Sequence, residues 1–250
     1  MSRNFELLTH AGKIQEILGA SEEPEIPFPA ETDASTPSLA VDGAVRDEIT
    51  KLVHNLFLLP GAKGPRQIVF AGTESRTGCS WVCAHAAEIL ASKVRASVCV
   101  VDCNLRSPGL HKQFGIQNHH GVSDALIQAN PIREYVSPLA RKNLWLLSCG
   151  ASGEHWKELV SSERMRLLLT DLRAEFDYVL IDAGALNTSD DAIVLGSLSD
   201  GVVLVLKANI SRRETARKAL QELLAANVPT LGAVLNQRTY PIPEAIYNLL

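Results

Sequence analysis

Short runs of consecutive apolar residues alternate along this chain with stretches in which apolar residues recur every three or four positions. The runs predict buried strands, and the recurring pattern predicts helices that bury one face. The expected strands cover residues 68–71, 97–102, 144–148, 178–182, 202–206 and 233–236. The expected helices cover residues 45–58, 80–93 and 212–225, and a further one carries Met165, Leu168, Leu169 and Leu172. This alternation predicts an α/β fold, with a mostly parallel sheet covered by helices on both faces.

The chain divides into four parts. Residues 1–20 predict an amphipathic helix that docks either on a partner or on its own domain, with an apolar stripe of Phe5, Leu8, Ala11, Ile14, Ile17 and Leu18. Residues 21–40 are rich in Pro, Glu and Ser and predict a flexible linker, because such a composition cannot bury a core. Residues 41–239 form the predicted α/β domain, and residues 240–250 form a tail. In the last predicted helix, the inward residues are expected to be Ala216, Leu220, Leu223 and Leu224.

A loop bounded by Gly72 and Gly78 follows the first expected strand and leads into a helix. This is the arrangement of a phosphate-binding loop, in which glycines let backbone N–H groups point at phosphates and a following hydroxyl holds Mg²⁺. Ser80 supplies that hydroxyl. The position of the phosphate-binding lysine is occupied by Cys79, and Arg76 is the only cation in the loop. Arg76 either reaches a phosphate or is solvated.

Two aspartates, Asp102 and Asp182, end separate apolar strands. Ligands of parallel α/β sheets bind beyond the carboxyl ends of the strands, so both carboxylates are expected beside the glycine-bounded loop. There they would bind Mg²⁺ and orient the attacking group. The alternative is that each carboxylate caps the turn that follows it. Asp191 either caps the next helix or lines the same site.

Composition and charge exclude several classes of protein. The 250-residue chain has a net charge of −4, which argues against binding to nucleic acid. Its apolar runs are far shorter than the roughly 20 residues of a membrane helix. The first 15 residues lack the apolar core of a secretory signal. Five cysteines fit a reducing, cytoplasmic compartment, and we expect them to be small buried residues rather than zinc ligands.

Several motifs occur together in one order. They are VVDCNLRSPGLHKQFG at residues 100–115, GVSD at 121–124, FDYVLID at 176–182, Asp-Ala at 191–192 and Val-Leu-Asn at 234–236. With these motifs the chain resembles the cytoplasmic ATPase domain of bacterial tyrosine kinases that control capsule and exopolysaccharide export, relatives of the MinD/ParA group. The likeness covers about residues 45–238 and the opening residues Met-Ser-Arg. It implies a P-loop NTPase-like fold that binds ATP and Mg²⁺.

The resemblance also assigns the site residues. Metal would be bound by Ser80, Asp102 and Asp182, with both aspartates serving catalysis. Nucleotide would be bound by Gly72, Arg76, Gly78, Cys79, Ser80 and Asn236, the last at the adenine. The implied partner is a membrane chain-length (co-polymerase) protein of polysaccharide export or an active kinase paralogue. A homo-oligomer of this chain is a further option. The implied location is the cytoplasm, at the inner membrane face through that partner.

Departures from the family pattern fall on the chemistry. Cys79 replaces the phosphate-binding lysine, and Asn104 replaces the second aspartate of the second Walker motif. Gly184 and Ala185 replace a Pro-Pro pair after the Walker B strand. Phosphoryl transfer depends on positioning and charge, so loss of the lysine and of the second aspartate predicts a weak or inactive enzyme. If the site has also closed, the protein is expected to bind no cofactor.

Departures also affect assembly and substrate. The helix before the domain carries Asp47 as the expected acid, but Thr50 and Val53 stand at the two arginine positions used for ring assembly. The tail has only Tyr240 and Tyr247 where the family carries a tyrosine cluster.

Three functions remain open on this basis. The first is a regulatory, catalytically degenerate member of the kinase family. The second is an ATP-binding tyrosine autokinase or ATPase with weak activity. The third is a MinD-like positioning protein, which would need a basic amphipathic tail that the last residues do not supply.

Overall fold

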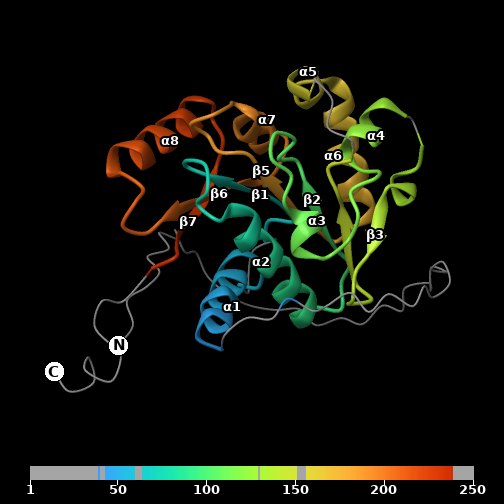
Figure 1. Ribbon diagram of the computed structural model, residues 1–250, viewed down its shortest axis with the longest axis horizontal. Helices are drawn as coiled ribbons and strands as arrows, with labels where there is room; N and C mark the ends of the chain where they lie inside the picture. Colours follow the sequence, from blue (N-terminus) through green and yellow to red (C-terminus); the bar gives the residue numbers. More distant parts are fainter. Residues whose placement is uncertain (1–38, 40–42, 60–63, 129, 151–155, 239–250) are drawn as a thin grey trace.

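The computed structural model describes residues 39, 43–59, 64–128, 130–150 and 156–238, and the side chains of all of these except residues 156 and 157. These residues build one seven-stranded sheet with strand order β3-β4-β2-β5-β1-β6-β7 (Figure 1). The strands are β1 (Gln67–Gly72), β2 (Val98–Asp102), β3 (Val136–Pro138), β4 (Leu144–Leu147), β5 (Tyr178–Ala183), β6 (Gly201–Lys207) and β7 (Thr230–Asn236). Only the pairing of β3 with β4 is antiparallel, so the predicted fold class is confirmed. The predicted N-terminal helix, the tail and nearly all of the linker lie outside the described residues.

Helices cover both faces of the sheet. They are α1 (Gly43–Phe57), α2 (Cys79–Lys93), α3 (Leu110–Gln113), α4 (Val122–Ile127), α5 (Trp156–Val160), α6 (Glu163–Glu175), α7 (Asp191–Ser197) and α8 (Arg213–Ala225), with a 3-10 turn η1 (Ile132–Glu134). None of the helices in the described ranges has the length and apolar character needed to cross a bilayer.

Successive side chains of each strand point to opposite faces of the sheet, so the core is divided into two clusters, one on each face. In β1, Ile68 and Phe70 belong to the cluster that includes α1 and α2, whereas Val69 and Ala71 belong to the cluster that includes α4, α6, α7 and α8. All four of these side chains are fully buried. A strand buried on both faces reads as an unbroken apolar run, which is why the sequence pattern located β1 correctly.

The predicted inward face of α8 is wrong in part. Leu223 is fully buried and Ala219 nearly so, but Leu220 and Leu224 are 38% and 62% exposed. The reason is the position of α8 beside β7, the last strand of the sheet. At this edge the helix buries only a narrow stripe, and two of the four leucine and alanine positions that we expected inside face outward.

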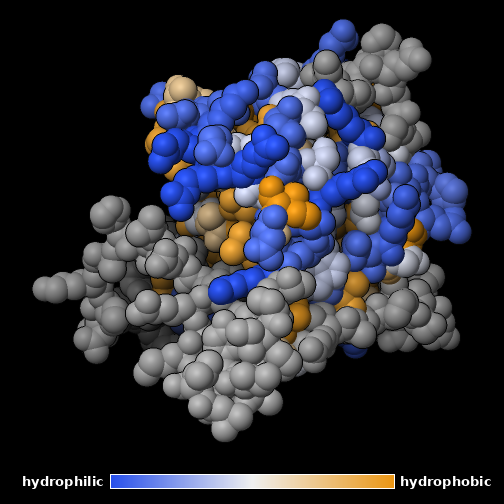
Figure 2. Space-filling view, turned by 60° about the vertical axis from the view of Figure 1, so that its left-hand side comes forward, coloured by the Kyte–Doolittle hydropathy of each residue, from blue (hydrophilic) through white to orange (hydrophobic). Residues whose placement is uncertain are grey.

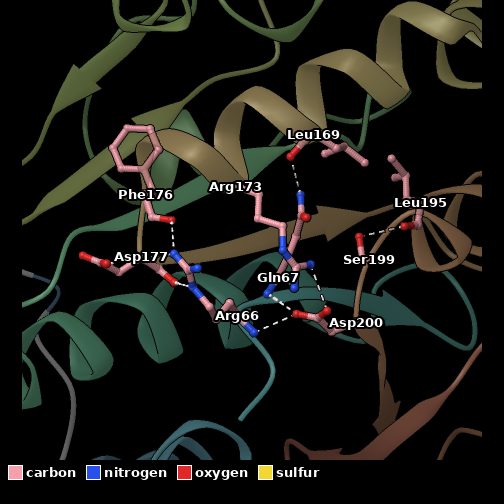
Figure 3. Close-up of polar contacts among 9 residues, drawn as sticks. All are labelled: Arg66, Gln67, Leu169, Arg173, Phe176, Asp177, Leu195, Ser199 and Asp200. Carbon is pink, nitrogen blue, oxygen red and sulfur yellow. Dashed lines mark hydrogen bonds and ion pairs between the residues drawn. The ribbon is translucent and has the colours of Figure 1, made fainter. Parts of the chain in front are cut away.

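A polar network joins the amino ends of the strands, on the edge opposite to the predicted site (Figure 3). Asp200 accepts hydrogen bonds from the backbone N–H groups of Arg66 and Gln67 at 2.7 and 2.9 Å, and it pairs with Arg173 at 2.9 Å. Arg66 donates to the carbonyl oxygen of Asp177 at 2.8 Å. Burial alone would raise the pKa of Asp200, but the two N–H groups and the Arg173 guanidinium lower it below its usual value. This network ties the start of β1 to β5, β6 and α6.

Candidate functional site

The predicted site residues meet at the carboxyl edge of the sheet. Asp102 at the end of β2 lies directly opposite Asp182 in the adjacent strand β5. The loop after β1 starts between β5 and β6, because β1 pairs with both. Three backbone bonds fix this edge: Thr73 donates to Val205, Cys103 to Asp182 and Leu186 to Gly72. The structure therefore brings together the loop and both aspartates, as the sequence predicted.

Two glycines give the loop its path. Gly78 has φ of 83°, in the left-handed region that suits glycine, and it precedes the first residue of α2. At Gly72, an added Cβ would lie 2.6 Å from the Thr77 hydroxyl oxygen and 2.8 Å from the Glu74 carbonyl oxygen. The loop thus has no room for a side chain at Gly72, and the left-handed backbone disfavours one at Gly78. A glycine-bounded turn of this kind is able to direct backbone N–H groups at an anion.

Asn236 holds this loop from β7. Its amide nitrogen donates to the carbonyl oxygen of Thr77 at 2.8 Å, and an added Cβ on Gly78 would collide with the same nitrogen. The sequence predicted a contact of Asn236 with adenine, and nothing in the structure tests that contact. What the geometry adds is a positioning role for Asn236 that no local pattern in the sequence indicated.

Asp102 is buried and well supplied with hydrogen bonds. Its carboxylate accepts from the backbone N–H groups of Asn104, Gly109 and Leu110 at 3.2, 3.0 and 3.0 Å. Burial raises the pKa of Asp102 to about 6, although the three N–H groups oppose the rise. Asp102 therefore combines the two roles that the sequence left open, since it organises the following turn and also faces the site.

Asp182 is the unusual group of the site. It is fully buried, and neither of its carboxylate oxygens has a hydrogen-bond partner of normal geometry among the described residues. Burial and the facing charge of Asp102 raise the pKa of Asp182 to about 8, and the neighbouring Ser80 and Cys79 side chains moderate the rise. A buried carboxylate that lacks a cation is disfavoured in its charged form, which is the physical cause of the raised pKa of Asp182.

Cys79 lies beside this carboxyl group and carries no charge. Its thiol is free and buried, and burial together with the charges of Asp182 and Cys83 raises its pKa well above the usual value. A lysine at this position would instead place an ammonium group next to Asp182. The substitution thus removes the cation both from the loop and from the buried carboxyl group.

The remaining cysteines are also buried, as predicted, and none of the five, all of which lie in the described residues, forms a disulfide. Burial raises the pKa values of Cys83 and Cys103, and the charges of Asp102 and Asp182 raise both further. The charge of Asp191 adds to the effect on Cys103 from the start of α7, where the Asp191 carboxylate accepts from the Ser189 hydroxyl at 2.7 Å. Across the described ranges, no cluster of three or more His, Cys, Asp or Glu side chains has the arrangement of a metal site on its own.

Two predicted contributors lie at the periphery. Arg76 is exposed with φ of 64°, and it forms no ion pair with any residue in the described part of the chain. The Asn104 amide oxygen would lie 3.6 Å from a Cβ built on Gly184, so Asn104 borders the site from the turn after β2. Neither side chain takes the place of the missing lysine.

The donor set fits a magnesium ion better than it fits a triphosphate. The orphaned oxygens of Asp182, the carboxylate of Asp102 and the hydroxyl of Ser80 are hard oxygen ligands of the kind Mg²⁺ prefers. The loop offers backbone N–H groups for phosphate, and the buried oxygens of Thr73 and Glu74 also lack partners in the described structure. The charge that should bind the β- and γ-phosphates is absent, because Cys79 is neutral.

Comparison of sequences identifies the family. Tyrosine-protein kinase YwqD of Bacillus subtilis is 30% identical over 159 residues, which cover 64% of this chain and 67% of YwqD. This chain belongs to the bacterial tyrosine-protein kinase family. Tyrosine-protein kinase wzc of Salmonella typhi is 26% identical over 169 residues, which cover 68% of this chain but only 23% of wzc. No protein-family model matches the chain.

Solved structures agree on the fold. The kinase domain of the Escherichia coli tyrosine kinase ETK superposes with a TM-score of 0.74 at 21% identity, covering 85% of this chain and 86% of that one. The septum site-determining protein MinD of Pyrococcus horikoshii, solved with Mg-ADP, gives a TM-score of 0.58 at 20% identity, covering 74% and 77%. Both are P-loop folds of the predicted class.

The face that should carry ring-assembly arginines is different in this member of the family. Val53 is fully buried, and the Thr50 hydroxyl donates back to the carbonyl oxygen of Arg46 at 2.8 Å within α1. Asp47 is exposed. Neither Thr50 nor Val53 supplies the charge that the family pattern expects at these positions.

Proposed function

We propose that this chain is a regulatory, catalytically degenerate member of the tyrosine kinase family. It would act in exopolysaccharide or capsule synthesis by binding a membrane co-polymerase protein or an active kinase paralogue. Its place would be the cytoplasmic side of the inner membrane, reached through that partner. The observation that carries the proposal is the buried, uncharged thiol of Cys79 at the lysine position, beside the Asp182 carboxyl group, whose oxygens have no partner among the described side chains.

The loss of charge decides against efficient phosphoryl transfer. Catalysis of this reaction depends on cations that stabilise charge on the transferred phosphoryl group. Removing one preorganised group of this kind costs on the order of 10²–10³ in rate. Here the thiol of Cys79 and the amide of Asn104 each replace a charged group that the family pattern expects.

The retained scaffold favours a binding role. The apolar strands are complete, the loop keeps both of its glycine positions, and Asn236 fastens the loop to β7. A regulatory paralogue would keep the fold and lose the central cation, which is the combination found here. Since the chain spans 23% of wzc, the activity and partners of that whole protein are not transferred to it.

The decisive experiment measures nucleotide binding to the purified full chain by titration calorimetry, with Mg·ATP and Mg·ADP. We expect the wild type to bind at least about 10²-fold more weakly than Cys79→Lys, which restores a cation beside Asp182. Cys79→Ala is the matched control, because it removes the thiol without adding charge, and it should behave as the wild type. Circular dichroism confirms that each variant is folded.

Phosphorylation provides the second measurement. The proposal predicts no phosphotyrosine on the purified chain after incubation with Mg·ATP, with Tyr240→Phe/Tyr247→Phe as the blank. Micromolar nucleotide binding by the wild type, or phosphotyrosine at Tyr240 or Tyr247, would contradict the proposal that the chain is catalytically degenerate. Either result would favour a working autokinase. If Cys79→Lys stays folded without binding, adding Asn104→Asp tests whether the second lost group is needed as well.

A further inference from the structure

Helix α8 exposes a stripe that mixes cations and leucines. Arg213, Arg217, Leu220 and Leu224 follow each other at intervals of four, three and four residues, so they share one side of the helix. All four are exposed, and Leu224 is the more open of the two leucines at 62%. The buried side of α8 is carried by Ala219 and Leu223 instead. The stripe is therefore a surface feature that the fold of the described chain does not use.

The surface around α8 continues this character. Leu235 of β7 is 44% exposed, and Ile210 in the turn before α8 is 58% exposed. Leu235 pairs in register with Leu206, which packs on the cluster that includes α8, so Leu235 faces the same side of the sheet as the helix. Figure 2 brings this edge forward and shows apolar atoms gathered among hydrophilic side chains. We call this surface the α8–β7 face; it comprises Ile210, Arg213, Arg217, Leu220, Leu224 and Leu235.

The segment that carries the two arginines of the α8–β7 face is basic in an acidic protein. Residues 207–218 contain five cations and one acid, whereas the whole chain has a net charge of −4. Arg212, Arg213 and Arg217 form no ion pair within the described structure; Lys218 pairs with Glu222 at 3.6 Å. Positive charge in the first turn of a helix opposes the helix dipole, so Arg212 and Arg213 do not stabilise α8. They are suited to an anionic occupant.

The same chain supplies an occupant of matching chemistry. Residues 21–33, SEEPEIPFPAETD, contain five acids, and no Lys or Arg occurs between Lys13 and Arg46. Ile26 and Phe28 stand in the middle of these acids. The segment thus offers carboxylates for the arginines and two large apolar side chains for the exposed leucines. Its charge is opposite to that of the α8–β7 face.

We propose that residues 21–33 dock on the α8–β7 face of their own chain. Leu39, where the described chain begins, packs on the cluster that α1 and α2 form with one face of the sheet. The residues between Asp33 and Leu39 span up to about 20 Å when extended, which is twice the roughly 10 Å between a sheet and the layer packed on it, so the segment is long enough to pass an edge of the sheet. Tethering raises the effective concentration of the segment, so a modest contact suffices. This docking does not depend on whether the site binds nucleotide.

The test uses the full chain and a labelled peptide. In the neutralised variant E22Q/E23Q/E25Q/E31Q/D33N, the segment loses its charge and leaves the face open. A fluorescein-labelled peptide of residues 21–34 should bind this variant about tenfold or more tightly than the wild type, whose own segment competes. Binding is measured by fluorescence anisotropy, and it should weaken in about 0.5 M salt because the contact is ionic.

Charge reversal locates the contact. Adding R213E/R217E to the neutralised variant should weaken peptide binding by about tenfold or more. The matched control is K93E/R95E, which reverses two exposed cations near the amino end of β2 and should change binding by less than about twofold. All four positions are exposed, so the variants should fold normally. In the wild type, carbodiimide should join Lys207 or Lys218 to a carboxylate of residues 22–33, and R213E/R217E should abolish this cross-link.

Three results would overturn the proposal. One is peptide binding that is equal with and without R213E/R217E. Another is that the wild type and the neutralised variant both bind vesicles with about 30% phosphatidylserine, and bind them equally well, because the face would then be open to lipid in both. The third is a wild-type dimer, measured by light scattering, that R213E/R217E converts to a monomer, because the occupant would then be a second copy.

Discussion

The side-chain amide of Asn236 donates a hydrogen bond to the carbonyl oxygen of Thr77 across 2.8 Å, which fastens the last strand of the sheet to the glycine-bounded loop. The same nitrogen occupies the space that a Cβ on Gly78 would need. Asn236 and Gly78 are therefore matched to each other. The conformation of the loop depends on this contact, whatever the loop binds.

Gly78→Ala should destabilise the protein by about 1–3 kcal/mol. Its φ of 83° is strained for alanine, and the new methyl group must displace Asn236. Asn236→Ala removes the obstacle, so the double variant should cost less than the sum of the single variants by about 0.5–1.5 kcal/mol. Urea unfolding measures all three. Gly43→Ala is the control, because a Cβ at Gly43 meets nothing within 4 Å. Strictly additive costs would refute the coupling.

The sequence located Asp102 and Asp182 because the carboxyl ends of parallel strands share one edge, so two aspartates after apolar runs must converge. It did not locate the bond between Asn236 and Thr77. These residues are 159 positions apart, and their contact depends on β6 and β7 following β1 in the strand order. No local pattern encodes that order. The raised pKa of Asp182 was equally hidden, because it depends on complete burial.

The exposed face of α8 was missed for a related reason. Apolar residues at 216, 219, 220, 223 and 224 form a stripe that is wider than the helix buries at the sheet edge. Periodicity gives the apolar side of a helix, but only the neighbouring strands decide how much of it is covered. The short antiparallel strand β3, which ends at Pro138, was missed because three residues carry too little pattern.

Adjacent leucines in α6 should differ sharply when truncated. Leu168 is 6% exposed and packs in the core, whereas Leu167 is 48% exposed. Leu168→Ala should therefore lower the free energy of unfolding by about 2–5 kcal/mol. Leu167→Ala, the matched control with the same change of volume, should stay within about 0.5 kcal/mol of the wild type. Equal losses, measured in urea, would mean that something covers Leu167 in solution.

Asp200→Asn should destabilise the amino edge of the sheet in a pH-dependent way. The folded-state pKa of Asp200 is lowered, so its stabilisation is present above the unfolded-state pKa and is lost as pH falls through the folded-state pKa. At pH 7 we expect a loss of about 1–2 kcal/mol, because the carboxylate accepts two backbone N–H groups and pairs with Arg173. The gap between wild type and variant should close below about pH 4. Asp171→Asn, at an exposed position, should show neither effect, and a gap that is constant with pH would contradict the assignment.

Asp182→Asn should make the protein more stable at high pH. A carboxyl group whose folded-state pKa is raised binds its proton more tightly when folded, so its contribution falls as pH rises from the unfolded-state pKa toward the folded-state value of about 8. Asparagine cannot ionise, and therefore the stability of the variant relative to the wild type should increase between about pH 5 and pH 9.

Urea unfolding at several pH values gives this difference directly, and the titration of groups that do not interact with Asp182 cancels in it. Asp102 lies opposite Asp182 with a pKa raised to about 6, so the two should titrate as a coupled pair and the increase should be spread over a wide pH range. Cys79→Lys should reverse the sign, because an ammonium group beside Asp182 favours its ionised form. A difference that is flat with pH would mean that Asp182 is already ionised and paired in solution, and that the site has a cation which Cys79 does not provide.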